Sequence, residues 1–238
     1  MSSKGRRREG TRRADLLLRH EVSILFQKGR AALRRGHHHE AEEVFARIIG
    51  IEPFHRGALA GLGEVHLHRK EHAQACELLE RAIAAGGASE HLIYNVANAC
   101  RGAQRRDRAF KYFEQLVTLN PSHLKGLTRF GEACLERKDF PRAEEVFRQA
   151  LELDSGNLYA LRGLAGALRG RRAHTEAIAV WERLLTLAPD DHRVILRLGE
   201  AYEHEGDAAS AVRAFRLALE VQPGNTYALA GLARLEGG

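Results

Sequence analysis

Apolar and polar residues alternate along this chain with a helical period, and the pattern starts again every 34 residues. When residues 22–55 are taken as the first block, apolar side chains recur at positions 4, 7, 8 and 11 and again at positions 20, 24, 27 and 28. Each set falls on one face of an α-helix. Turn signals such as Arg35-Gly36 and Gly206-Asp207 separate the two sets. The pattern therefore predicts a pair of helices joined by a short turn in every block.

The block occurs six times without an insertion or a deletion. The six blocks, called repeats 1 to 6 below, cover residues 22–55, 56–89, 90–123, 124–157, 158–191 and 192–225. One such hairpin cannot bury its apolar faces alone, so neighbouring hairpins are expected to stack around a continuous core. The sequence thus predicts an all-α solenoid, with a tail at 1–13, a helical extension at 14–21 and a capping helix at 226–238.

Side-chain size recurs as regularly as polarity. Position 8 is small and holds Gly29, Gly63, Ala97, Gly131, Ala165 and Gly199. Position 20 is always alanine, and position 24 is large and holds Phe45, Leu79, Phe113, Phe147, Trp181 and Phe215. Because nothing larger than a methyl group occurs at position 8, two helices are expected to touch there.

A Leu-Gly pair followed by an alanine, an aromatic residue and a closing proline at this spacing resembles the tetratricopeptide repeat family. The best example in the chain is Leu198-Gly199 with Ala211, Phe215 and Pro223. The resemblance covers six times 34, or 204, of the 238 residues. It implies a right-handed α-solenoid that binds a partner peptide or helix in a concave groove. Position 11 departs from the family pattern, because Tyr202 is the only aromatic residue there.

The resemblance also implies which residues face the groove, namely those at positions 2, 5, 6, 9, 12 and 13 of the repeat. The groove residues selected on this basis are Tyr94, Asn95, Asn98, Lys125, Arg129, Tyr159, Arg162, Arg193 and Arg197. Arg169 joins them, against the acidic residues Glu132, Glu200 and Glu203. Arginine binds carboxylates in a two-pronged fork, so an acidic partner segment is expected.

Some chaperone-binding members of the family clamp the carboxylate at the end of a partner chain. The resemblance carries that clamp only in part: Asn95, Lys125 and Arg129 match, whereas Ala60 and Glu64 stand where lysine and asparagine are required. The chaperone-tail interpretation is therefore weaker than a general preference for acidic peptides.

Charge is concentrated at the N-terminus. The chain has a formal net charge of +6, and residues 1–13 carry six basic residues against Glu9, which gives +5 and leaves +1 for the rest. The arginines of this tail are Arg6, Arg7, Arg8, Arg12 and Arg13. The segment is expected to be disordered, and an alternative function follows from it, namely binding of nucleic acid or an anionic membrane surface.

Composition and motifs narrow the class of protein. The chain is 44% hydrophobic and 29% charged, and it lacks an apolar run long enough to cross a membrane, so a soluble cytoplasmic protein is expected. Neither a nucleophile elbow nor a phosphate-binding loop occurs. Neighbouring acidic pairs such as Glu42-Glu43 diverge on a helix. The expectation is a non-enzymatic adaptor or scaffold without a cofactor.

Cysteine and histidine are interpreted as structural residues. Cys100 and Cys134 share position 11 of adjacent repeats, which places them about 8–10 Å apart and beyond disulfide reach. With Cys76 they are expected to be small core residues. The run from His37 to His39 lacks further ligands at metal spacing, so a metal site is not expected.

The N-terminal extension is more apolar than one buried face requires. Two interpretations remain open for Leu16, Leu17, Leu18, Val22, Ile24, Leu25 and Phe26. Either Leu18, Val22 and Leu25 pack on repeat 1 while the others cover the end of the core, or the excess surface docks on a second protomer or a partner.

Overall fold

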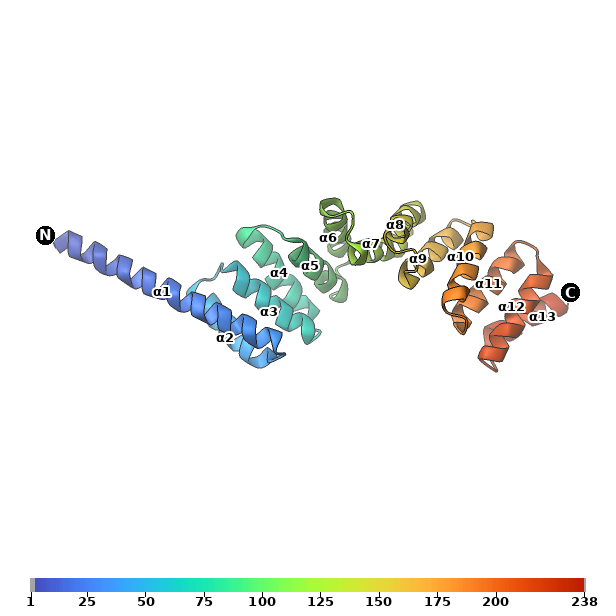
Figure 1. Cartoon of the computed structure of the whole chain (residues 1–238), viewed down its shortest axis with the longest axis horizontal. Coiled ribbons are helices and arrows are strands. Elements are labelled where there is room, and N and C mark those ends of the chain that lie inside the picture. Colours follow the sequence, from blue (N-terminus) through green and yellow to red (C-terminus); the bar gives the residue numbers. More distant parts are fainter. Residues whose placement is uncertain (1–2, 238) are drawn as a thin grey trace. The chain divides into compact units, whose positions relative to one another are not determined.

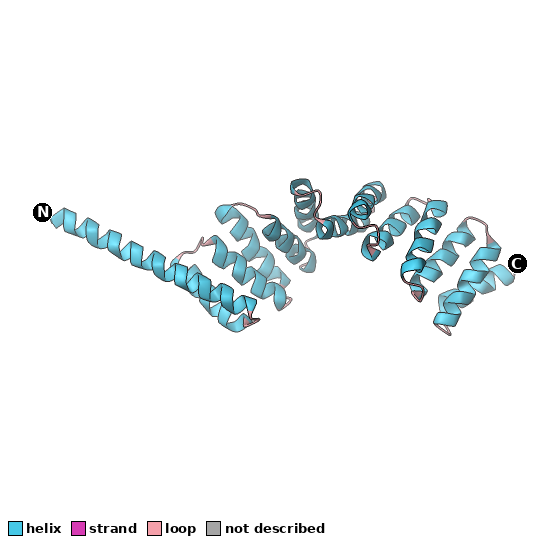
Figure 2. Cartoon of the chain, viewed as in Figure 1, coloured by secondary structure: helices cyan, strands magenta, loops and turns pink. Residues whose placement is uncertain are grey.

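The computed structural model describes the backbone of residues 3–237 and the side chains from Leu16 onward. The described chain folds into thirteen α-helices joined by short loops and has no strand (Figure 2). The first seven helices are α1 (Ser3–Arg34), α2 (His38–Ile51), α3 (Arg56–His68), α4 (His72–Gly86), α5 (Glu90–Gly102), α6 (Arg106–Leu119) and α7 (Leu124–Glu136). The remaining six are α8 (Phe140–Leu153), α9 (Leu158–Gly170), α10 (His174–Leu187), α11 (His192–His204), α12 (Ala208–Val221) and α13 (Thr226–Glu236). The predicted all-α fold is confirmed.

Each predicted repeat corresponds to two successive helices, and α13 follows the sixth repeat (Figure 1). The chain divides into two compact units, residues 1–115 and 116–238, called unit 1 and unit 2. In unit 1 the helices α1 to α5 pack on their neighbours in chain order, and in unit 2 the helices α7 to α13 do the same. Both units therefore have the stacked-hairpin arrangement that the repeat predicts.

The turn between the two helices of a repeat has one conformation throughout. Position 15 lies in the left-handed region of backbone space in every repeat, at Gly36, Lys70, Gln104, Lys138, Arg172 and Gly206. Glycine adopts this conformation without a steric cost, whereas other residues pay for the Cβ atom. Four of the six turns therefore keep a residue other than glycine at some cost in stability.

The first helix of repeats 2 to 6, and α13 after them, begins at a side-chain cap. At position 34 the residues His55, Ser89, His123, Asn157, Asp191 and Asn225 each accept a hydrogen bond from a backbone N–H of the helix that follows. Such a cap satisfies a donor that the helix itself leaves without a partner. The second helices are capped less evenly, since Asp139 and Asp207 accept this bond but Ala173 has no side chain that can.

The core is built from a large side chain seated between two small residues. The ring of Phe147 on α8 is 1% exposed, and a Cβ atom added at Gly131 or Gly163 would lie 2.6 or 2.1 Å from it. Phe45 is enclosed in the same way by Gly29 and Gly61. The predicted contact at position 8 is confirmed, and position 6 of the following repeat forms the other wall.

The N-terminal end differs in part from expectation. The backbone is helical from Ser3 onward, whereas the sequence analysis predicted a disordered segment over residues 1–13; arginine, lysine and glutamate are good helix formers, which favours continuation of α1. Val22 is buried and Leu25 packs against the core, whereas Leu18, which one of the two open interpretations placed against repeat 1, is 43% exposed. Figure 1 shows the first half of α1 extending beyond α2.

Three further apolar side chains of α1 face solvent. Leu16, Leu17 and Ile24 are 67%, 64% and 57% exposed.

Among the described residues, no helix combines the length and apolar character that crossing a membrane requires.

Candidate binding groove

A hollow of about 620 Å³ opens between α9, α10 and α11 of unit 2. Its wall includes Phe140, Arg169, Arg172, His174, Trp181, Arg197, Glu200 and His204. Part of this wall is built by a contact that recurs between repeats: the side chain at position 17 of one repeat packs against position 13 of the next. Phe140 covers Gly170 in this way, and the rings of His174 and His204 stack with their centres 4.7 Å apart.

The charge of this hollow is mainly positive. Arg197 binds Glu200 on the same helix at 2.6 Å. Within the part of the chain whose side chains are described, Arg169 and Arg172 have no carboxylate partner, and both line the hollow. Since a guanidinium group stays charged at any physiological pH, the hollow offers two cations that are not neutralised by a neighbouring acid.

A second hollow of about 420 Å³ shares two residues, Arg197 and Glu200, with the first. It is lined by His192, Arg193, Leu196, Arg197, Glu200, Gln222, Asn225 and Tyr227. Arg193 is exposed and likewise has no carboxylate partner among the described side chains. The two hollows together are called the unit 2 groove.

Other predicted groove residues of unit 2 are engaged or fully solvated. Arg162 binds Asp191, the cap of α11, at 2.6 Å. Burial alone would raise the pKa of Asp191. The hydrogen bonds from Arg162 and from the backbone N–H of Val194 together lower it by more, so this pKa lies below its ordinary value. Tyr159 is 69% exposed. Arg162 thus supports the start of α11 and is less free to bind a partner than its position suggests.

Two acidic residues at groove positions, Glu132 and Glu203, are also engaged in ion pairs. Arg129 binds Glu132 one turn away at 2.8 Å, and Lys125 is exposed nearby on α7. Arg234 of α13 binds Glu203 at 2.8 Å, and this hydrogen bond lowers the pKa of Glu203. Glu203 is therefore an anchor for the capping helix, and it does not oppose an acidic ligand as a free charge would.

In unit 1 the predicted groove residues bind one another and their own helix. Asn95 donates to the carboxylate of Glu64 at 3.4 Å, and His91 contacts the same Glu64 oxygen at 2.9 Å. Asn98 donates to the carbonyl of Tyr94 at 2.8 Å. A partner's terminal carboxylate would face Glu64 here, which agrees with the poor match of this repeat to the chaperone clamp.

A third hollow, of about 460 Å³, lies in unit 1 between α1, α3 and the start of α5, and sequence reasoning did not predict it. Its lining combines apolar and basic side chains, including Phe26, Arg30, Leu33, Arg34, Arg56, Glu64 and Leu92. Two glycines in its wall let aromatic rings pack directly against the backbone of α3. A Cβ atom at Gly57 would lie 2.5 Å from Phe26, and one at Gly61 would lie 2.5 Å from Phe45.

Sequence reasoning also missed part of the unit 2 groove. Arg172 and His174 belong to the turn and the start of the second helix, whereas only first-helix positions were considered. His204 stands at groove position 13 but was not among the residues selected. The signal was available, since His38 and His68 occupy the same two positions in repeats 1 and 2 and stack at the same 4.7 Å.

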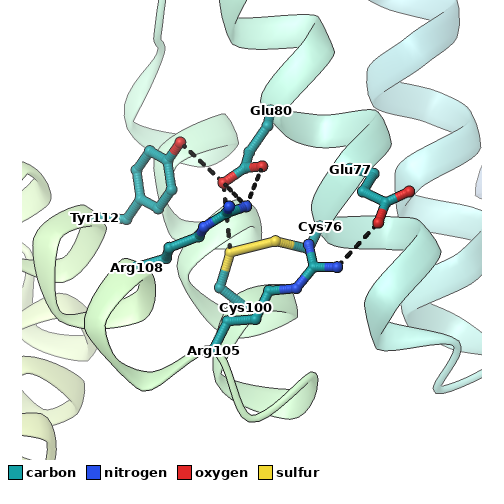
Figure 3. Close-up of polar contacts among 7 residues, drawn as sticks. All are labelled: Cys76, Glu77, Glu80, Cys100, Arg105, Arg108 and Tyr112. Carbon is teal, nitrogen blue, oxygen red and sulfur yellow. Dashed lines mark hydrogen bonds and ion pairs between the residues drawn. A yellow bond between two sulfur atoms is a disulfide. The ribbon is translucent and has the colours of Figure 1, made fainter.

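The interpretation of the cysteines is wrong for two of the three. Cys76 on α4 and Cys100 on α5 form a disulfide, with their Cα atoms 5.3 Å apart (Figure 3). The sequence analysis compared Cys100 with Cys134, which share a position, and overlooked that position 21 of one repeat lies against position 11 of the next. Cys134 is buried on α7 as predicted.

Residues Arg6, Arg7, Arg8, Arg12 and Arg13 have side chains outside the described residues. Their role in binding nucleic acid or an anionic surface stays a prediction.

The sequence is similar to parts of two longer proteins. The chain is 29% identical over 229 residues to cellulose synthase operon protein C of Xanthomonas axonopodis pv. citri, which covers 89% of this chain and 15% of the relative. It is 32% identical over 112 residues to heat shock protein STI1 of Saccharomyces cerevisiae, covering 47% of this chain and 19% of the relative. The chain thus spans less than a fifth of the length of these two relatives.

Solved structures show the same fold. A tetratricopeptide repeat protein from Parabacteroides merdae superposes with a TM-score of 0.67 at 18% identity, over 90% of this chain and 85% of that one. Tetratricopeptide repeat profiles match residues 26–90, 94–157, 135–192 and 168–235. The chain therefore belongs to the tetratricopeptide repeat family.

Proposed function

We propose that this protein is a non-enzymatic adaptor or scaffold that binds an acidic segment of a partner protein in the unit 2 groove. Proteins of this family generally mediate protein–protein interactions. The observation that carries the proposal is the pair of hollows with Arg169, Arg172 and Arg193, three cations without a carboxylate partner among the described side chains.

The chemistry of the groove selects the kind of segment. Guanidinium groups bind carboxylates in bidentate pairs, and the half-buried Phe140 in the same wall offers apolar contact. A segment with two or more carboxylates flanking an apolar residue satisfies both. A basic segment would have to approach these arginines against like charge, which costs free energy.

At Arg197 a partner carboxylate would compete with Glu200. The ion pair of Arg197 with Glu200 is 2.6 Å long and lies within the groove, so a partner carboxylate must displace or share Glu200. An exposed pair of this kind is worth only about 0.2–1 kcal/mol, which is less than a bidentate contact to a partner can return. Arg197 is therefore proposed as a secondary contact, and the arginines without an acid nearby as the primary ones.

Affinity capture with mass spectrometry tests this function. The groove variant carries Arg169→Glu and Arg193→Glu, which reverse two of the primary cations. A control variant carries Lys138→Glu and Arg213→Glu, which change the net charge equally at exposed positions outside the groove. A third form lacks residues 1–13. The proposal expects a protein partner that the control variant and the shortened form retain and the groove variant loses.

Two outcomes would contradict the proposal. If the groove variant retains every partner, the unit 2 groove is not the binding surface. If the shortened form alone loses its partner, and nucleic acid or lipid is lost with it, the tail carries the function instead, with the steep salt dependence typical of phosphate contacts.

Self-association through α1 is the second candidate, and the exposed Leu16, Leu17 and Ile24 favour it. Sedimentation measured over a range of concentrations tests it. A mass that stays monomeric at high concentration in the wild type, and does not differ in a Leu17→Glu variant, would exclude self-association through this helix.

A further inference from the structure

The disulfide between Cys76 and Cys100 joins two adjacent repeats of unit 1. Cys76 lies on the second helix of repeat 2 and Cys100 on the first helix of repeat 3, and both residues are fully buried. Their Cα separation of 5.3 Å is within the normal range for a disulfide, so the helices need not shift to form it. The bond therefore fastens α4 to α5 across the junction.

A network of fixed polar groups surrounds the pair (Figure 3). The nearest is Glu80, whose Oε1 lies 3.9 Å from the Sγ of Cys100. Arg108 binds the same carboxylate at 3.1 Å, and the Tyr112 hydroxyl donates to it at 3.4 Å. Figure 3 shows these side chains converging on Glu80 from α6. Glu80 is thus held in place by groups other than the cysteines.

This arrangement accommodates the reduced pair as well as the oxidised one. A Cys100 thiol would find an acceptor already positioned in Glu80, and a buried cysteine otherwise packs as a small apolar residue. Equivalent junctions stand without a disulfide, since the corresponding positions hold Glu42 and His66 between repeats 1 and 2. Folding of a junction in this chain therefore does not require the bond.

We propose that Cys76 and Cys100 are a reversible thiol–disulfide exchange site that fastens repeat 2 to repeat 3 when oxidised and leaves the junction without this covalent link when reduced. The co-reactant is a small-molecule disulfide. One protein thiolate attacks it to form a mixed disulfide and releases one small thiol. The second protein thiolate then displaces the other small thiol, so two electrons pass from the protein sulfurs to the reagent and the two protons end on the released thiols.

Burial sets how the exchange proceeds. Because both cysteines are fully buried, a reagent reaches a sulfur only when α4 and α5 open locally. The exchange is therefore slow in the closed protein and accelerates when unit 1 is loosened by a mild denaturant.

A metal site is the competing use of the same atoms. The sulfurs of both cysteines and a carboxylate oxygen of Glu80 lie within 4.8 Å of one another, which would supply three ligands. The carboxylate is already shared by Arg108 and Tyr112, and the guanidinium group repels a cation beside it. A disulfide between the two sulfurs leaves these contacts in place.

Through α5, the disulfide also affects the predicted groove residues of unit 1. This helix carries His91 and Asn95, which bind Glu64 of α3. Fastening α5 to α4 holds these two side chains against Glu64. Reduction is expected to increase the exchange of backbone amides in α5 with solvent.

The first test counts thiols on the full chain equilibrated with mixtures of reduced and oxidised glutathione. After an acid quench and alkylation, intact mass gives the number of free thiols. The proposal expects two thiols to disappear together in the wild type and in Cys134→Ala, the matched control in unit 2. In Cys76→Ala the remaining Cys100 is expected to form only a mixed disulfide.

The second test compares the stability of the oxidised and reduced wild type. A bond that closes a loop of this size raises the melting temperature by on the order of 10 °C. The increase should appear together with slower amide exchange in α4 and α5, and it should persist in Cys134→Ala. These readouts use the wild type, so they hold even if a cysteine variant folds poorly.

Three results would overturn the proposal. One is a pair that stays reduced at every glutathione ratio, and another is a disulfide that resists reduction until the chain is fully unfolded. The third is a reduced protein that binds one Zn²⁺ per chain, protects both thiols from alkylation and no longer forms the disulfide, which would assign the site to a metal.

Discussion

At the scale of single residues, the repeat depends on a large side chain held between two small ones. Phe45, Phe147 and Phe215 each lie between a glycine of their own repeat and a glycine that follows. At the equivalent place after Leu79 and Trp181, the chain has Asn95 and Arg197. Position 6 is therefore either part of the core or a polar groove residue, and the groove chemistry varies from repeat to repeat for this reason.

Two glycines on α9 should respond in opposite ways to the same substitution. In Gly163→Ala the new Cβ atom would lie 2.1 Å from the buried Phe147 ring, and we expect the free energy of unfolding to fall by about 1–3 kcal/mol. In Gly166→Ala the nearest atom is 3.7 Å away, and we expect a rise of about 0.5–1 kcal/mol because alanine favours the helix. Urea unfolding measures both; equal effects would mean that the ring does not occupy this place.

Tyr202 should show a stability contribution that disappears in alkali. Its hydroxyl donates to Glu182 at 2.6 Å, and this bond raises the pKa of Tyr202 to about 12. Because the pKa is higher in the folded than in the unfolded chain, the contribution is complete below pH about 10 and is lost as the pH rises toward 12.

Tyr202→Phe is the corresponding variant. We expect its free energy of unfolding to be lower than that of the wild type by about 0.5–1 kcal/mol at pH 8, with the difference shrinking at pH 11. Denaturant unfolding of both proteins at the two pH values measures this. A difference that grows with pH would show that the hydroxyl is not bonded to Glu182.

At the scale of helices, the ends are fixed by caps and the turns by backbone conformation. The caps at position 34 recur in every described repeat junction, although the residue varies from histidine to asparagine. The second helices are uneven, because Asp139 caps α8 while Ala173 stands at the same place before α10. One substitution can therefore supply the missing cap.

Ala173→Asp should stabilise the start of α10. We expect the free energy of unfolding to rise by about 1 kcal/mol, since an aspartate at this position accepts a backbone hydrogen bond and favours the helix dipole. The reciprocal variant, Asp139→Ala, should lower it by a similar amount. Thermal unfolding compares the pair, and a destabilising Ala173→Asp would contradict the proposed geometry of the turn.

The repeat made the helices predictable, because periodicity in six copies fixes where each helix lies and which face is buried. Contacts between side chains of neighbouring repeats were harder to predict from the sequence. The Cys76–Cys100 bond and the stacked His174 and His204 join different positions of neighbouring repeats, and a comparison of equivalent positions does not reveal such pairs. The ion pair of Arg162 with Asp191 lies within repeat 5, but it also joins two different positions, 29 residues apart, and was missed.

At the scale of the whole molecule, charge distribution distinguishes two modes of binding. The tail carries +5 of the formal +6, so its interactions should weaken steeply with salt. The groove combines Arg169, Arg172 and Arg193 with apolar walls, so a segment bound there keeps part of its affinity when charges are screened. The position of the cations, more than their number, is what the adaptor proposal depends on.

The most direct test of the account is the affinity of a fluorescent, glutamate-rich peptide containing one tryptophan, measured by anisotropy at physiological salt. In this test the groove variant is the neutral form, Arg169→Gln with Arg193→Gln, and its control is Lys138→Gln with Arg213→Gln. We expect the groove variant to weaken binding by about tenfold or more, equivalent to about 1.4 kcal/mol, and the control to bind as the wild type does. Equal affinities for the two variants would contradict the proposal that the unit 2 groove recognises acidic partners.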